Sequence, residues 1–403
     1  MEKSTRYCVP VTALEGIRVL DVSQVMAGPY CTMMLADLGA DVIKVEPPAG
    51  DSTRRWAGTE GTDSAGFNAV NRGKRGIVLN LKEPQARGVF RRLARDADIV
   101  VENYRPGVMA AFELDYPRLS AVNPRVIYAS ISGYGQTGPA AAKGGFDLIA
   151  QAVSGIMSVT GEPAGPPVKA GIPITDLGAA LFALSGILAA LYHRTRTGHG
   201  QYIDTSLLEA GIALSVWEAT EYFAGSGIPR PVGSAHRLSA PYQAIRCADG
   251  FIVIGAANDR LFRRLCELLD HPEWIADPEF RDDTARVRHR DRLVSLIERE
   301  TTGRSRHHWL TVLEANDIPC GPINTYEDTF RDEHVRSRQM VVETDHPTLG
   351  RIPTLGSPLK MSGTPATPGR RGPLLGEHTS EVLREAGYTD EELNGLRAAG
   401  AIA

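Results

Sequence analysis

The 403-residue sequence lacks the signatures of several common enzyme classes. It contains no G-x-S-x-G nucleophile elbow, no H-E-x-x-H metal motif and no Walker loop. No G-x-G-x-x-G follows the first predicted strand, so nicotinamide binding has little support. The five cysteines are scattered, odd in number and without a C-x-x-C pair, which argues against a disulfide framework or a zinc site. We therefore expect a protein of a reducing compartment with no metal site.

Long regions of one charge sign are also missing. The net charge is −4, with 23% charged and 42% hydrophobic residues, and acidic and basic side chains are interleaved along the chain. This gives no basic patch for nucleic acid and no polybasic arm for a membrane. Residues 1–12 contain no apolar segment of the kind found in secretory signals. We expect a cytoplasmic protein without a nucleic-acid or membrane partner.

Only one long hydrophobic run is present, and it follows Asp176. The run of about 15 uncharged residues is too short for a membrane span and contains Gly178, Ser185 and Gly186. It predicts a buried core helix. Asp176 at its start has two readings, a helix N-cap that accepts a backbone N–H bond or a reactive carboxylate, and the run alone does not decide between them.

The first half of the chain alternates between strand and helix patterns. Short β-type runs occur at 17–23, 40–46, 75–81, 98–104 and 125–135, and helical patterns at 27–39 and 83–97. Strands separated by helices imply right-handed crossovers and a parallel sheet. We predict an α/β fold with a Rossmann-like open parallel sheet.

The second half has a different character. Residues 225–234 are rich in Gly, Pro and Ser, a hairpin signal surrounds Asp249-Gly250, and charged helical stretches follow. We predict a large domain built from residues 1–225 and the tail 331–403, with a smaller α+β domain at 226–330. The tail carries two short helices and returns to the large domain.

Polar residues gather in loops after the predicted strands. Asn103, Tyr104 and Arg105 follow the fourth strand, at the edge of a parallel sheet where ligands bind. The sequence Arg-Pro-Gly is equally common in surface turns. Four cations between residues 72 and 82 are suited to phosphate groups, but charge runs more often solvate an edge.

Eight segments, taken in order from Leu14 to the tail, resemble the class III (family III) CoA-transferases. This family includes formyl-CoA transferase, crotonobetainyl-CoA transferase and related acyl-CoA racemases. The segments are LEGIRVLDVSQVMAGPYCTMMLADLGADVIKVEPP, NRGKRGIVLNLK, VVENYRPGV, YASISGYGQTGP, GFDLIAQAVSG, PITDLGAALFALSGILAAL, GHGQYIDTSLLEA and PLLGEHTSEVL. No single segment is decisive, but the set in this order is specific.

The resemblance implies a chemistry for Asp176, which matches the aspartate nucleophile of the family. That residue forms an enzyme-bound mixed anhydride and then an aspartyl-CoA thioester, which splits one difficult exchange into easier steps. CoA thioesters are substrates, and no permanently bound cofactor is implied. The resemblance also implies an interlocked homodimer.

Binding residues carry over from the family by position. CoA contacts are implied for Met26, Ala27, Leu79, Asn80, Leu81, Lys82, Asn103, Tyr104, Arg105, Lys143, Gly144, Gly145 and Phe146. The candidates for binding the nucleotide phosphates of CoA are Arg72, Lys74, Arg105 and Lys143. Substrate contacts are implied for Asp147, Gly233, His236 and Arg237. The chain departs from the family at Met26, where formyl-CoA transferase has Gln, and at Pro47 and Ala111, where arginines are common.

Phe146 separates two branches of the family. The racemases use a histidine at this position together with the aspartate, and a phenyl ring cannot transfer a proton. We therefore favour a CoA-transferase over a 2-methylacyl-CoA racemase, and the retained Asp176 counts against a silent CoA-binding homologue. An intramolecular CoA-transferase stays open as an alternative. The segment from Gly233 to Asn258 is most similar to the branch that uses succinyl-CoA and a small dicarboxylate such as glutarate, malate, itaconate or mesaconate.

Overall fold

The computed structural model describes residues 12–56 and 63–403. They form two compact units, each described by itself below. The first holds the described residues up to Ile156, Ala170–Ala219 and Glu333–Ala403, and the second holds Met157–Lys169 and Thr220–Asp332. The sequence boundaries near residues 225 and 330 stay predictions. Cys8 and the N-terminal segment expected not to be a signal lie outside the described residues.

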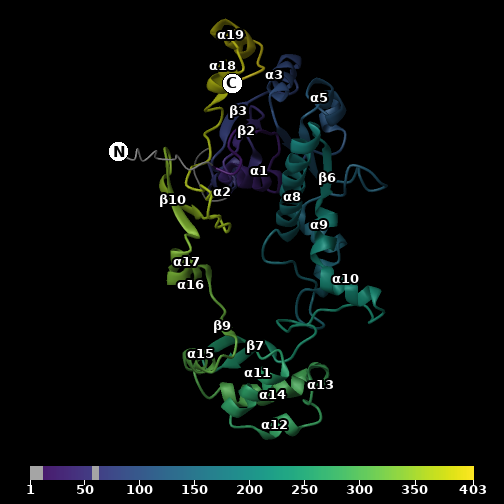
Figure 1. Cartoon of the computed structure of the whole chain (residues 1–403), viewed down its shortest axis with the longest axis vertical. Coiled ribbons are helices and arrows are strands. Elements are labelled where there is room, and N and C mark those ends of the chain that lie inside the picture. Colours follow the sequence, from purple (N-terminus) through teal and green to yellow (C-terminus); the bar gives the residue numbers. More distant parts are fainter. Residues whose placement is uncertain (1–11, 57–62) are drawn as a thin grey trace, which may run out of the picture. The chain divides into compact units, whose positions relative to one another are not determined.

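The first unit is organised around one parallel sheet (Figure 1). Its spatial order is β3-β2-β1-β4-β5-β6, and every neighbouring pair is parallel. The strands are β1 Arg18–Asp21, β2 Asp41–Glu46, β3 Arg75–Val78, β4 Ile99–Glu102, β5 Ile127–Ser132 and β6 Tyr202–Ser206. This confirms the predicted α/β fold with an open parallel sheet.

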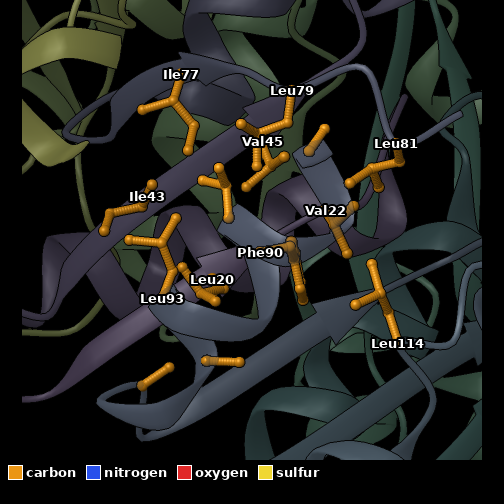
Figure 2. Close-up of a cluster of buried hydrophobic side chains, with 14 of the residues drawn as sticks. Leu20, Val22, Ile43, Val45, Ile77, Leu79, Leu81, Phe90, Leu93 and Leu114 are labelled. Carbon is orange, nitrogen blue, oxygen red and sulfur yellow. The ribbon is translucent and has the colours of Figure 1, made fainter. Parts of the chain in front are cut away.

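Both faces of this sheet are buried, as parallel sheets require. Successive residues of a strand point to opposite faces, so β1 sends Leu20 into one core cluster and Val19 into the other. Figure 2 shows the first cluster, in which Leu20, Ile43 and Phe90 meet. The near-continuous apolar runs of the inner strands explain why these strands could be predicted from the sequence.

Helices cover the two faces of the sheet. In and near the first unit they are α1 Ala27–Asp37, α2 Ala65–Asn71, α3 Pro84–Arg95, α4 Val108–Ala111, α5 Tyr116–Val122, α6 Asp147–Val153, α7 Ile156–Val159, α8 Ile174–Thr197, α9 Leu207–Leu214, α10 Val216–Phe223, α17 Glu333–Ser337, α18 Thr379–Glu385 and α19 Asp390–Ala398, with the 3-10 turn η1 Ser52–Arg55. The helices α9 and α10 are separate, because the chain leaves helical geometry at Ser215.

The helix α8 corrects one expectation. It packs against α1, α9 and the sheet through small residues such as Gly178 and Ala183, but its other side is exposed and carries Phe182 and Tyr192. It is therefore apolar on two sides and buried on only one. By length and composition it is also the one described helix that could cross a membrane, although the sequence predicts a core helix.

The C-terminal tail completes the first core. α18 packs on β3, and Val382, Leu383 and Leu393 join the cluster of Figure 2. Near the chain end, Ile402 pairs with Leu79 in an isolated β-bridge.

The remaining strands form two small antiparallel sheets. The first unit carries the hairpin β10 Val341–His346 with β11 Gly350–Leu355. The second unit carries the sheet β7 Tyr242–Cys247, β8 Gly250–Gly255 and β9 Cys320–Pro322. The predicted hairpin is confirmed, because Cys247 pairs with Gly250 at the turn and Gly250 has φ +140°. The helices of this unit are α11 Asp259–Leu268, α12 Glu273–Ala276, α13 Asp283–Arg288, α14 Arg290–Thr301, α15 Arg306–Ala315 and α16 Tyr326–Arg331.

Candidate active site

A cavity of about 300 Å³ lies at the carboxyl ends of the parallel strands, within the first unit. The strand order reverses between β1 and β4, and the loops after these strands diverge and leave a crevice. Its lining comes from the loops after β1, β4 and β5, the segment before α6, and the starts of α8 and α9. The lining residues are Gln24, Val25, Met26, Ala27, Asn103, Tyr104, Arg105, Pro106, Ile131, Ser132, Gly133, Lys143, Gly144, Gly145, Phe146, Asp147, Asp176 and Leu207.

Two glycines bring the Lys143–Asp147 segment onto the end of β5. A Cβ added to Gly133 would lie 2.7 Å from the Cα of Gly145, and one added to Gly145 would lie 2.6 Å from the Cα of Gly133. Both distances are shorter than real Cβ contacts, so the two backbones can approach only because neither residue has a side chain. This contact places Phe146 and Asp147 at the cavity.

Asp147 caps the N-terminus of α8. Its Oδ1 accepts hydrogen bonds from Thr175 N at 3.0 Å, Thr175 Oγ1 at 2.7 Å and Asp176 N at 3.4 Å. Its Oδ2 accepts from Nε2 of the buried Gln151 at 2.6 Å. The amide hydrogens that a helix leaves free at its start are thus satisfied by an acid from another helix. Of the two readings of Asp176, the capping role is filled by Asp147.

Asp176 is left in the cavity without a capping bond. It lies in the first turn of α8, and no side chain within α8 caps the helix. Burial raises the pKa of Asp176 to about 7, and the nearby negative charge of Asp147 adds to the rise. A carboxyl with this pKa changes its charge near neutrality.

Two cations line the same cavity. The guanidinium of Arg105 lies over Gly144, where an added Cβ would approach within 2.9 Å of it, and Lys143 precedes that glycine. Both side chains are exposed, and within residues 12–56 and 63–403 neither forms an ion pair. They are therefore placed to meet an anionic ligand.

The structure does not bring Arg72 and Lys74 to this cavity. Arg72 bonds Asp37 at 2.6 Å and 3.1 Å, and Lys74 lies buried at 2.8 Å from a carboxylate oxygen of Asp21. Both cations are neutralised inside the chain, so their interpretation as phosphate ligands needs correction. Sequence could not show this, because the partner carboxylates lie 35 and 53 residues away.

The segment from Leu79 to Lys82 also lies outside the cavity lining. Leu79 and Leu81 are buried in the first core, and Asn80 bonds the chain end through Ala401 O. Lys82 is exposed. A CoA contact of these four residues stays a prediction.

Gly233, His236 and Arg237 belong to the second unit. Gly233 has φ +63° and donates its N–H to Gly161 O, and the ring of His236 stacks on Tyr242 at 5.1 Å. Arg237 lies 3.5 Å from Glu221. Their role at the substrate stays a prediction.

Several cavity residues were not named individually as site residues from the sequence. Gln24, Val25, Ser132, Gly133 and Leu207 line the cavity, and each lies in or next to a loop after a strand. Their position at a strand end was the available signal. Within the described part of the chain, no group of three or more His, Cys, Asp or Glu side chains could hold a metal ion.

Comparison with known proteins decides the family. Residues 14–379 match the family model described as CoA-transferase family III. The chain belongs to this family. It is therefore a CoA-transferase, and proteins of this kind use CoA thioesters as substrates.

Curated relatives cover almost the whole CoA-transferase chain. It is 39% identical to a human succinyl-CoA:glutarate CoA-transferase, over 97% of this chain and 90% of the relative. It is 42% identical to the succinate–glutarate CoA-transferase of Agrobacterium fabrum, over 92% and 95%. Identity to the succinyl-CoA:mesaconate CoA-transferase of Haloarcula marismortui is also 42%, over 93% and 96%. A crystal structure of a CAIB/BAIF family protein from Brucella suis has a TM-score of 0.83 at 38% identity, over 93% and 99%.

The raised pKa of Asp176 predicts a pH-dependent effect of Asp176→Asn on stability. The unfolded carboxyl titrates near its ordinary value of 3.8, so the native state holds an extra proton between pH 4 and 7. The wild type therefore loses stability as pH rises through this window, whereas the amide does not. Above pH 7 we expect the variant to be more stable by roughly 1–3 kcal/mol.

Urea unfolding at several pH values measures this difference. It should grow between pH 4 and 7 and then stay constant. A difference that does not change with pH would show that Asp176 ionises in the native state as it does in the unfolded chain. Asp176→Ala provides a second variant that also lacks the charge.

Proposed function

We propose that this CoA-transferase moves CoA from succinyl-CoA to a small dicarboxylic acid, with Asp176 as the covalent nucleophile. The observation that supports this proposal is that the carboxylate of Asp176 does not cap α8, because Asp147 does, and lies in a cavity that Arg105 and Lys143 also line. The donor and the acid class are those of the relatives named above as succinyl-CoA:glutarate and succinyl-CoA:mesaconate CoA-transferases. Which acid is preferred is left to the experiment below.

The reaction proceeds through four exchanges at one carboxylate. An oxygen of Asp176 attacks the thioester carbon of the donor, the C–S bond breaks, and CoA leaves as a thiolate. The thiolate then attacks Cγ of Asp176 and releases the donor acid, which leaves an aspartyl-CoA thioester. The incoming carboxylate attacks the same Cγ and expels the thiolate, which finally attacks the acceptor acyl carbon and restores Asp176.

No proton is transferred in these exchanges, because each leaving group departs as an anion. The ionised form of Asp176 is therefore needed, and a second acid–base residue is not. Phe146 lies 70% exposed at the cavity and offers no proton. The phenyl ring in place of a second base supports CoA transfer over racemisation, because racemisation needs two bases.

The positive charges at the cavity suit the anionic parts of CoA. Arg105 and Lys143 are the two cations in its lining, and we assign them to the diphosphate or the 3′-phosphate. The loop residues Met26 and Ala27 border the same space. Arg237 remains our candidate for the free carboxylate of the acid, as the sequence resemblance implies.

We also propose a homodimer. In the first unit, apolar side chains on α6, α8 and α9 are exposed, including Leu148, Phe182, Tyr192, Ile212 and Leu214. A second copy of the chain would cover such a surface, and the dimer was implied by the family resemblance. Sedimentation at micromolar concentration should show two chains, and a monomer would contradict the proposal. A cytoplasmic location also stays a prediction.

The substrate is tested by incubating the enzyme with succinyl-CoA and one acid at a time. The panel contains glutarate, malate, itaconate and mesaconate, with butyrate and valerate as monocarboxylate controls. Mass spectrometry of the CoA esters should show transfer to at least one dicarboxylate and little to the controls. Asp176→Asn should form no new ester, and without acceptor only the wild type should gain a covalent CoA adduct. Transfer by the Asn variant would remove Asp176 from the chemistry.

Asp147→Asn tests the like-charge interaction at the site. The neutral amide can still accept from Thr175 but no longer repels the charge of Asp176, so the pKa of Asp176 should fall. In the wild type, kcat/KM should drop as pH falls below about 7, because protonated Asp176 cannot attack. In the variant this acid limb should move to lower pH by roughly half a unit to one unit.

The pH profile of kcat/KM for succinyl-CoA between pH 5 and 9 measures the shift. Arg105 and Lys143 face the same cavity and remain in both proteins, so they serve as a constant background. An unchanged acid limb would show that burial alone sets the titration of Asp176.

A further inference from the structure

The loop from Ser23 to Ala27 connects β1 to α1 and borders the cavity that contains Asp176. Within it Val25 has φ +69°, in the left-handed region. This conformation is rare for a β-branched residue, because its Cβ crowds the backbone. Residues held in such a conformation need support from their surroundings.

Part of this support comes from Asn103 after β4. Its Oδ1 accepts the N–H of Gln24 at 2.7 Å, and its Nδ2 donates to the Gln24 carbonyl at 2.7 Å. The side-chain amide of Asn103 therefore bonds both the backbone N–H and the backbone carbonyl of Gln24, as a neighbouring β-strand would. The sequence reading assigned Asn103 to CoA, but both ends of its amide bond the loop.

The other part comes from a buried ion pair. Oδ2 of Asp51 accepts the N–H of Val25 at 3.1 Å and lies 3.2 Å from Nζ of Lys44. The same ammonium donates to the carbonyl of Ser23. Both Asp51 and Lys44 are fully buried, so the pair holds the backbone on both sides of Gln24.

We propose that Asp51 and Lys44 are positioning residues for CoA transfer, which hold Val25 left-handed and thereby set the loop against the substrate. The proposal rests on the proposed function, because it assigns the loop to the same site. Neither side chain lines the cavity, so their effect passes through the backbone of residues 23–27. A buried pair alone is weak evidence for a stabilising role, and its replacement by apolar residues is often neutral.

The test combines Asp51→Asn with Val25→Gly. Asn is the same size but carries no charge, and Lys44 still faces Asp21 and Glu46, which favours a folded variant. Glycine adopts positive φ without strain, so a chain that carries Val25→Gly needs the pair less. In the wild-type background, we expect Asp51→Asn to lower kcat about tenfold. In the Val25→Gly background, the same substitution should lower kcat by less than about threefold.

A matched control is Asp98→Asn. Asp98 also accepts from a backbone N–H, that of Arg18 at 2.9 Å, and pairs with a buried cation, Arg194 at 2.8 Å. It lies at the opposite ends of the strands, just before β4. The Asp98→Asn variant should lose thermal stability as the Asp51→Asn variant does, but its kcat should not fall by a comparable factor.

A second measurement needs no turnover. Amide hydrogen exchange should become faster in residues 23–27 of Asp51→Asn, and not in the same residues of Asp98→Asn. Equal loss of kcat with and without Val25→Gly, or unchanged exchange in the loop, would overturn the proposal. If the wild type transfers CoA to no acid in the panel, the proposed function fails, and the exchange result still decides whether the pair holds the loop.

Discussion

The hydrogen bonds between Asp147 and the start of α8 determine how the carboxylate of Asp176 is placed at this site. A helix N-terminus offers a small number of free amide hydrogens, and an aspartate at its mouth would ordinarily accept one of them. Asp147 accepts them from outside the helix, so Asp176 keeps its carboxylate in the cavity. Burial raises the pKa of Asp176 to about 7, and the negative charge of Asp147 adds to the rise. Asp147 therefore leaves the carboxylate of Asp176 free and, together with burial, raises its pKa.

The inner strands and the parallel sheet were predictable, because strands such as β2, β4 and β5 are mostly apolar and buried on both faces and this signal is local. The positions of Asn103 and Arg105 at a strand end followed from the same pattern. Contacts between distant residues were not predictable. Lys74 lies in a basic run typical of a solvated edge, yet its partner is Asp21 in β1. The left-handed Val25 was equally hidden, since a β-branched residue gives no signal for positive φ. The exposed side of α8 was missed because an apolar helix reads as buried.

The basic residues therefore fall into two groups with different physical roles. Lys44, Arg72 and Lys74 are buried and paired with Asp51, Asp37 and Asp21, so they act inside the fold, and Lys44 also bonds the loop after β1. Arg105 and Lys143 are exposed at the crevice and keep their charge for an incoming anion. The amino-acid composition does not distinguish these two groups. Whether a given cation is paired depends on which carboxylates the fold places near it.

The chain end has a consequence for synthesis. Ile402 pairs with Leu79, and Ala401 accepts a hydrogen bond from Asn80, so the first core receives some of its last contacts from the final residues. On the ribosome, the β1–β6 segment must wait through the translation of almost 200 further residues before that core can close. The larger part of the second unit, Thr220–Asp332, lies within that interval and contains the whole of its own core, so this unit can fold first. A nascent chain of this protein thus exposes apolar residues of its first core until the tail emerges, and early termination would leave these residues accessible to chaperones and proteases.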